Sequence, residues 1–171
     1  MAVQRKSDVL IIGAGPVGLF AALNLAERGL DVQVVDKDWR GAAHSYALAL
    51  HPDTLRLLDS LGVADDLLGQ GYRVERMALY QGQERVGQFD FAALDKRFPF
   101  LLIAAQSALE QALSARLVEK KVKVLWNHQA MSIEQDGDGV TAKIGRMEKY
   151  STGYPVAHTE WMVAKEYTTR A

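Results

Sequence analysis

The chain of 171 residues contains no cysteine. This absence excludes disulfide bonds, thiol catalysis, cysteine-ligated metals and the redox-active cysteine pair of disulfide reductases. Serine–histidine–aspartate catalysis also lacks support, because Ser151 has no nucleophile-elbow frame around it. We expect no metal site either, since no paired ligand spacing relates the four histidines, His44, His51, His128 and His158.

An excess of charge of one sign is also missing. The chain has 20 basic and 21 acidic residues and a formal net charge of −1, so no global field attracts it to nucleic acid or to a membrane surface. It has no apolar run of the roughly 20 residues that a membrane span requires. Arg5 and Lys6 precede an apolar segment, as in a signal peptide, but Asp8 and three glycines interrupt that segment. We expect a cytoplasmic protein that binds neither nucleic acid nor membrane.

What is present begins with a strand–turn–helix–strand pattern near the N-terminus. Residues 8–12 form a short run rich in branched apolar residues, which predicts a fully buried strand. Residues 16–28 have helical apolar spacing and are followed by Gly29, a favourable C-terminal cap. Residues 32–35 predict a second buried strand. The pattern predicts a right-handed βαβ unit.

The remaining sequence adds helices, one more parallel strand and antiparallel hairpins. A polar loop over residues 36–45 separates these elements from the βαβ unit. Strand 122–126 follows a helix and is expected to join the first two strands in a parallel sheet. The other predicted elements are helix 52–61 with a further turn or two to residue 68, antiparallel strands over 72–91 meeting near Gln81–Gly82, strand 100–105, helix 107–119, a hairpin of 133–135 and 140–144 around the turn 136–139, and strand 161–167.

The glycine turn GAGPVGLF (13–20) carries the strongest chemical signal. Gly13 can adopt a sharp strand-to-helix turn, Gly15 lets the main chain approach a pyrophosphate, and Gly18 permits close packing of helix on strand. The free N–H groups and the positive end of the helix dipole would face an anion. Asp36 ends the second strand, 23 residues after Gly13, near the spacing expected of a ribose-binding acid. An ADP-bearing cofactor is the favoured interpretation; the alternatives are a turn without ligand and an ordinary strand-end acid.

Four stretches extend the pattern over nearly the whole chain. Together with Pro16 inside the glycine turn, they resemble the FAD-dependent aromatic-ring hydroxylase family, the p-hydroxybenzoate hydroxylase-like flavoprotein monooxygenases. The stretches are GAGPVGLFAALNLAERGLDVQVVD (13–36), SYALALHPDTLRLLDSLGV (45–63), QSALEQALSARL (106–117) and VLWNHQAMSIEQDGDGVTAKI (124–144). The resemblance implies an α/β fold: a Rossmann-like FAD-binding βαβ core with a parallel sheet, an antiparallel β-meander and the start of a β-rich substrate domain.

The resemblance also implies which residues hold the cofactor. The glycine turn would line the FAD pyrophosphate, and Asp36 would hold the adenosine ribose, although the family more often has Glu there. Gln106 would contact the ribityl–phosphate chain, or else is an unliganded helix-start residue. Ala130 would lend backbone contacts to the adenine, or else only fills its strand. Arg40 is either a phosphate or adenine contact or an exposed loop arginine. The full set of expected cofactor-binding residues is Gly13, Gly15, Pro16, Val17, Gly18, Asp36, Lys37, Arg40, Gln106 and Ala130.

Two departures from the family pattern limit this interpretation. Near Tyr46, many relatives carry an arginine beside the flavin or the nicotinamide nucleotide, whereas this sequence has tyrosine there. The family's Asp-Gly motif in the next parallel strand and its later Gly-Asp pair are absent, and DGDG at 136–139 is a hairpin turn that should not be mistaken for either. The resemblance therefore implies the N-terminal part of such a protein, with FAD-binding segments 1–71 and 106–171 and a partial substrate-domain insert at 72–105.

In this family, NAD(P)H reduces FAD, and the reduced flavin uses oxygen to hydroxylate a small aromatic substrate; we name no catalytic residue. If a further strand normally pairs with residues 8–12, we expect this chain to self-associate through that apolar edge and to bind FAD weakly or not at all. Two alternatives stay open. One is a non-catalytic nucleotide-binding module. The other is a related flavin reductase or dehydrogenase that does not use oxygen.

Overall fold

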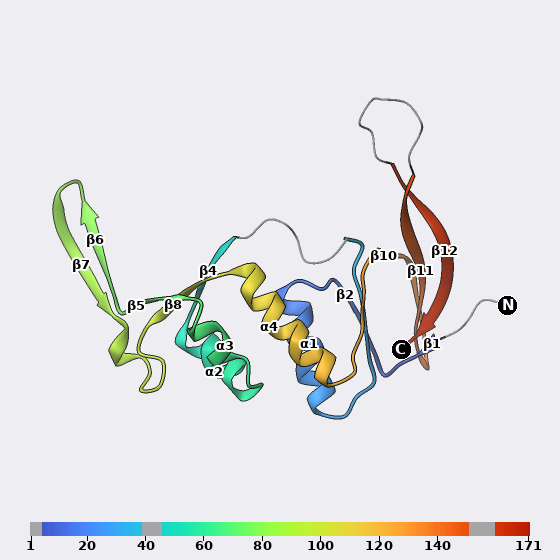
Figure 1. The fold of residues 1–171 in the computed structure, drawn as a ribbon, viewed down its shortest axis with the longest axis horizontal. Coiled ribbons are helices and arrows are strands. Elements are labelled where there is room, and N and C mark those ends of the chain that lie inside the picture. The colour runs from blue at the N-terminus through green and yellow to red at the C-terminus, as the bar shows by residue number, and fades with distance from the viewer. Residues whose placement is uncertain (1–4, 39–45, 151–159) are drawn as a thin grey trace. The chain divides into compact units, whose positions relative to one another are not determined.

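A computed structural model describes residues 5–38, 46–150 and 160–171 of the chain (Figure 1). Backbone contacts divide the chain into two compact units, residues 1–42 with 117–171 and residues 43–116. Each unit is described by itself below. The α/β class with both parallel and antiparallel sheets, expected from the sequence, is confirmed.

The first unit contains the expected βαβ unit. Strand β2 (Val9–Ile12) leads into helix α1 (Pro16–Glu27) and then into strand β3 (Val32–Val35), which pairs with β2 in parallel. Strand β9 (Val124–Leu125) adds a third parallel strand in the order β2-β3-β9. All four residues of β3 are buried, and α1 contributes Leu19 to the core beside it. Strand β3, the middle strand of the three, therefore lies in the core of this unit.

The same unit contains a four-stranded sheet in the order β1-β12-β11-β10. Strands β10 (His128–Asp136) and β11 (Gly139–Tyr150) form the predicted hairpin, and β12 (Glu160–Arg170) continues it in antiparallel fashion. Strand β1 (Arg5–Lys6) pairs in parallel with the end of β12. Buried Ala142 and Ile144 of this sheet pack against Val35 of the parallel sheet, so one core joins the two sheets.

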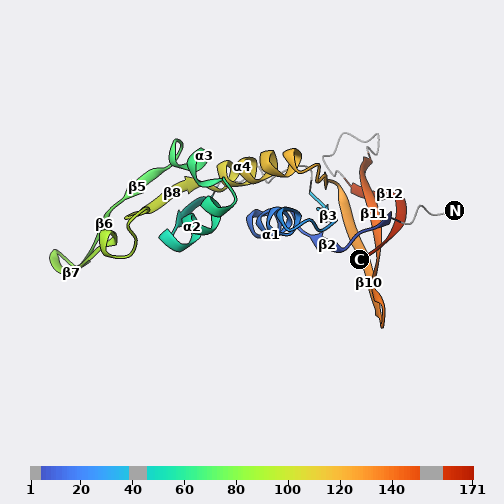
Figure 2. The same ribbon diagram turned by 90° about the horizontal axis from the view of Figure 1, so that it is seen from below.

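The second unit is built on an antiparallel sheet of β4 (Ala47–Leu50), β8 (Leu101–Ala105) and β5 (Tyr72–Val74) in the order β4-β8-β5. Helices α2 (Pro52–Ser60) and α3 (Ala64–Leu68) bury leucines in its core, and helix α4 (Gln106–Glu119) follows β8 directly. Strands β6 (Arg76–Gln81) and β7 (Glu84–Asp90), followed by the 3-10 turn Phe91–Ala93, form the predicted hairpin, which extends away from the rest of this unit (Figure 2).

The structure corrects two expectations and adds a strand. Strand β2 is only half-buried, with Ile12 50% exposed, because β3 is its one strand partner in the described part of the chain. Strand β9 is shorter than 122–126, because the N–H of Val122 still binds the carbonyl of Leu117 and closes α4. Strand β4 was not foreseen, since its four residues become a strand only by pairing with β8.

Candidate functional site

The three glycines of the turn between β2 and α1 are not under the same structural constraints. Gly13 has a φ of +104°, in the region that favours glycine, and its N–H binds the carbonyl of Val35 at 2.8 Å. A Cβ at Gly18 would lie 1.9 Å from the carbonyl oxygen of Gly13, so only glycine lets the helix pass this close. Gly15 is under neither constraint.

Gly15 has a φ of −73° and a ψ of −179°, an extended conformation that any residue adopts. No protein atom lies within 4 Å of where its Cβ would be. Neither the backbone angles nor the packing of the chain therefore requires glycine at this position. An open cradle at the start of a helix is the geometry in which a bound pyrophosphate, rather than the protein, excludes a side chain.

The first turn of α1 presents backbone donors to this cradle. Pro16 occupies the first helical position, where its missing N–H removes no helical hydrogen bond. The N–H groups of Val17 and Gly18 have no acceptor within the helix, and no side chain caps them. Val17 is itself 83% exposed, so its side chain is not packed in the core. Free donors of this kind, at the positive end of a helix dipole, are suited to binding an anion.

Asp36 faces this turn from the end of β3. Its Oδ2 accepts a hydrogen bond from the N–H of Ala14 at 2.6 Å, and its Oδ1 accepts one from the N–H of Asp38 at 2.8 Å. Each carboxylate oxygen has a second lone pair, so the group can still accept hydrogen bonds from ribose hydroxyls. The structure thus brings Asp36 and the glycine turn together. Lys37, the next residue, is exposed.

The start of β10 lies beside the residues that follow β3. The N–H of His128 binds the carbonyl of Asp36 at 2.7 Å, and the N–H of Asn127 binds the carbonyl of Asp38 at 3.1 Å. Ala130 packs against the buried cluster that contains Val35. Ala130 therefore sits at the same end of β3 as Asp36, in the same unit. Arg40 lies outside the described residues.

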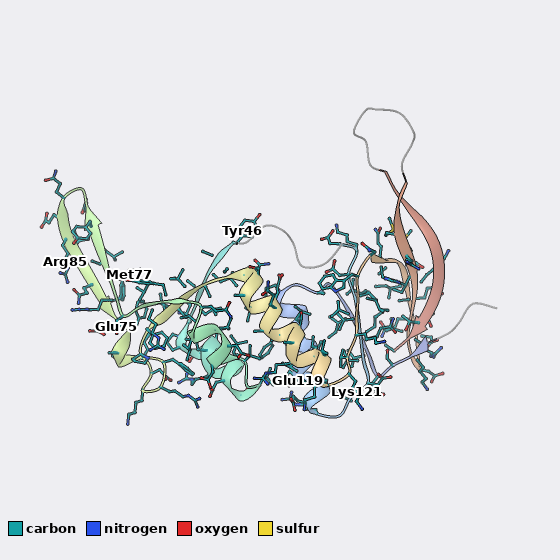
Figure 3. All side chains as sticks on the ribbon, viewed as in Figure 1. Tyr46, Glu75, Met77, Arg85, Glu119 and Lys121 are labelled. Atoms are coloured by element: carbon teal, nitrogen blue, oxygen red, sulfur yellow. The ribbon has the colours of Figure 1, made fainter. Side chains whose placement is uncertain are left out.

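Gln106 lies in the second unit, where β8 ends and α4 begins. Its backbone N–H binds the carbonyl of Tyr46 at 2.8 Å, and its side-chain Nε2 donates to Glu110 at 2.8 Å. Tyr46, which lies near the place where the family resemblance implies an arginine, is 65% exposed and projects beyond the start of β4 (Figure 3). Sequence reasoning missed Ala14 and Glu110. The spacing of four residues between Gln106 and Glu110 was a signal that could have found the latter.

Within the described residues, no group of three or more histidine or acidic side chains could hold a metal ion. In the same part of the chain, no helix is both long enough and apolar enough to cross a membrane. The groups that the described residues bring together at the turn are backbone donors, one carboxylate and the N-terminal end of a helix.

A βαβ unit with a glycine turn, free helix N–H groups and an acid at the end of the second strand defines the class of dinucleotide-binding α/β proteins. Comparison with known proteins makes the assignment more specific. Residues 6–164 match the family described as "FAD binding domain", and the chain belongs to this family.

Two relatives of known name are monooxygenases. The chain is 35% identical over 141 residues to 6-methylpretetramide 4-monooxygenase of Streptomyces rimosus, covering 81% of this chain and 25% of the relative. It is 29% identical over 143 residues to para-nitrophenol 4-monooxygenase of Pseudomonas sp. (strain WBC-3), covering 81% and 36%. The crystal structure of p-nitrophenol 4-monooxygenase from Pseudomonas putida DLL-E4 superimposes with a TM-score of 0.80 at 27% identity, covering 98% of this chain and 39% of that chain. The chain thus spans between a quarter and two-fifths of the length of these proteins.

Proposed function

We propose that this chain is the FAD-binding portion of an NAD(P)H-dependent flavoprotein monooxygenase that hydroxylates a small aromatic or phenolic substrate. Membership of the FAD-binding family and the names of the relatives support this proposal. The observation that carries it is Gly15, a glycine that neither backbone angles nor packing requires.

FAD, when bound, would supply the redox chemistry, and the residues of this chain would hold and orient it. The N–H groups of Val17 and Gly18 would bind the pyrophosphate oxygens, and Asp36 would accept hydrogen bonds from the adenosine ribose. The backbone of Ala130 would border the adenine, and Gln106 would contact the ribityl chain. These roles need no nucleophile from the protein, and we assign no catalytic residue.

The proposal also covers the location of the enzyme, the roles of its segments and the pairing of strand β2. We place the enzyme in the cytoplasm, with segments 1–71 and 106–171 serving FAD and segment 72–105 starting the substrate domain. The second edge of β2, which has no strand partner in the described part of the chain, supports pairing of residues 8–12 with a further strand or with a second copy. Oxygen consumption supported by NAD(P)H and a phenol would separate a hydroxylase from a flavin reductase.

The test of the binding site is the variant Gly15→Ala. A methyl group fits the free chain there, and the gain from a stiffer unfolded chain is opposed by the poorer N-cap that alanine makes, so we expect stability to change by less than about 1 kcal/mol. The same methyl group would occupy the cradle of the pyrophosphate, and we expect ADP affinity, measured by calorimetric titration, to fall at least about tenfold, or 1.4 kcal/mol.

Gly69→Ala is the matched control. Gly69 also has an ordinary φ, −76°, and no atom within 4 Å of its missing Cβ, but it lies in the second unit. We expect this variant to bind ADP as the unmodified chain does. A Gly15→Ala variant that binds ADP with unchanged affinity contradicts the proposed site.

A further inference from the structure

A buried carboxylate lies one helical turn from Gln106. Glu110 is only 7% exposed although it carries an ionisable group, and its Oε1 accepts a hydrogen bond from Nε2 of Gln106 at 2.8 Å. Both residues belong to α4, four positions apart, so the helix itself sets their approach. Buried carboxylates are rare unless they are paired, and Gln106 supplies a hydrogen-bond partner for this one.

The chemistry of the pair decides which way the Gln106 amide points. In the structure the amide turns its NH2 group toward Glu110, whose Oε1 accepts the hydrogen bond from Nε2. The carbonyl oxygen Oε1 of Gln106 is then directed away from Glu110, and within the described residues it accepts no hydrogen bond. The backbone of Gln106 is fixed as well, because its N–H binds the carbonyl of Tyr46.

We propose that Glu110 is a positioning residue that holds the Gln106 amide so that Oε1 accepts a hydrogen bond from a ribityl hydroxyl group of FAD. This inference rests on the proposed function and makes one contact of it specific. An amide oxygen cannot donate to a phosphate, and the neighbouring carboxylate would repel one. Gln106 therefore recognises the hydroxyl-bearing part of the cofactor and not its phosphates.

The test titrates the 171-residue chain and its variants with FAD and, separately, with ADP, up to millimolar ligand. Glu110→Gln keeps the shape of the side chain but lets the Gln106 amide turn over. We expect it to weaken FAD binding about three- to tenfold, the effect of one hydrogen bond, and to leave ADP binding unchanged, because ADP has no ribityl chain. Glu119→Gln, an exposed position on the same helix, is the control and should change neither affinity.

A double-mutant cycle separates positioning from a general structural role. If Glu110 acts through Gln106, Glu110→Gln has no further effect on FAD affinity in a Gln106→Ala background. If Glu110→Gln fails to fold, selective ¹⁵N labelling of glutamine in the unmodified chain takes its place. The side-chain amide proton of Gln106 should then show the downfield shift of a hydrogen bond to a carboxylate, and its absence overturns the inference.

The outcomes distinguish this inference from the proposed function. A chain that binds neither ADP nor FAD contradicts both. A chain that binds ADP and FAD, but whose FAD affinity is unchanged by Glu110→Gln, contradicts only the role of Glu110. Equal weakening of ADP and FAD, additive effects in the cycle, or FAD binding no tighter than ADP also overturn it.

Discussion

Replacing Gly18 by alanine tests the close packing of α1 on the glycine turn. The added Cβ would lie 1.9 Å from the carbonyl oxygen of Gly13, 3.1 Å from its carbonyl carbon and 3.4 Å from Cγ2 of Ile11. Real Cβ atoms essentially never approach another heavy atom closer than 3.0 Å. The helix or the turn must therefore move by about 1 Å, and the nearest atom belongs to the backbone, which yields far less easily than the end of a side chain.

Overpacking of this kind destabilises proteins by about 1–3 kcal/mol. For a chain of this length, 1 kcal/mol corresponds to about 2–4 °C in Tm, so Gly18→Ala should melt about 2–12 °C lower than the unmodified chain. Thermal unfolding followed by circular dichroism measures the change. Gly15→Ala, three residues earlier, carries the same added methyl group into open space and should melt close to the unmodified chain, because the unfolded-state gain and the poorer N-cap oppose each other. Equal melting temperatures for the two variants would refute this description of the turn.

Two aspartates yield further predictions. Both oxygens of Asp36 accept backbone N–H groups, so Asp36→Asn must turn an NH2 group toward one of them. We expect a loss of about 1–3 kcal/mol in urea unfolding and weaker ADP binding, whereas Asp38→Asn, whose side chain makes neither contact, should change little. The N–H of Asp138 and the charge of Arg170 lower the pKa of Asp136. Asp136 thus adds to stability above the ordinary aspartate pKa of about 3.9, and this contribution is lost as the pH falls through the lowered value. Asp136→Asn should flatten the acid limb of the stability–pH curve; identical acid limbs would contradict the assignment.

Local patterns were sufficient to predict the βαβ unit. The apolar run before Gly13, the helical spacing after Pro16 and the cap at Gly29 act within a few residues of one another, and the structure places β2, α1 and β3 accordingly. The hairpin around residues 136–139 was predictable for the same reason, since its turn residues are adjacent in the chain.

Features that depend on distant partners were not predictable. Nothing in the sequence near Ala14 shows that its N–H binds a carboxylate 22 residues away. Strand β4 exists through its pairing with β8, and the half-burial of β2 follows from the strand order of its sheet. Glutamate is usually an exposed residue on a helix, but Glu110 is buried and binds Gln106. Its burial depends on how the whole chain packs, which the local sequence does not show.

We propose, above all, that the glycine turn binds the pyrophosphate of FAD. Amide chemical-shift mapping of the ¹⁵N-labelled chain, titrated with FAD, tests it most directly because Val17 and Gly18 would each donate an N–H to the phosphate oxygens. We predict that the largest shifts occur at Gly15, Val17 and Gly18, and that Gly15→Ala needs at least about tenfold more FAD to produce shifts at the remaining amides of the turn. A titration in which these amides stay in place while others move would contradict the claim.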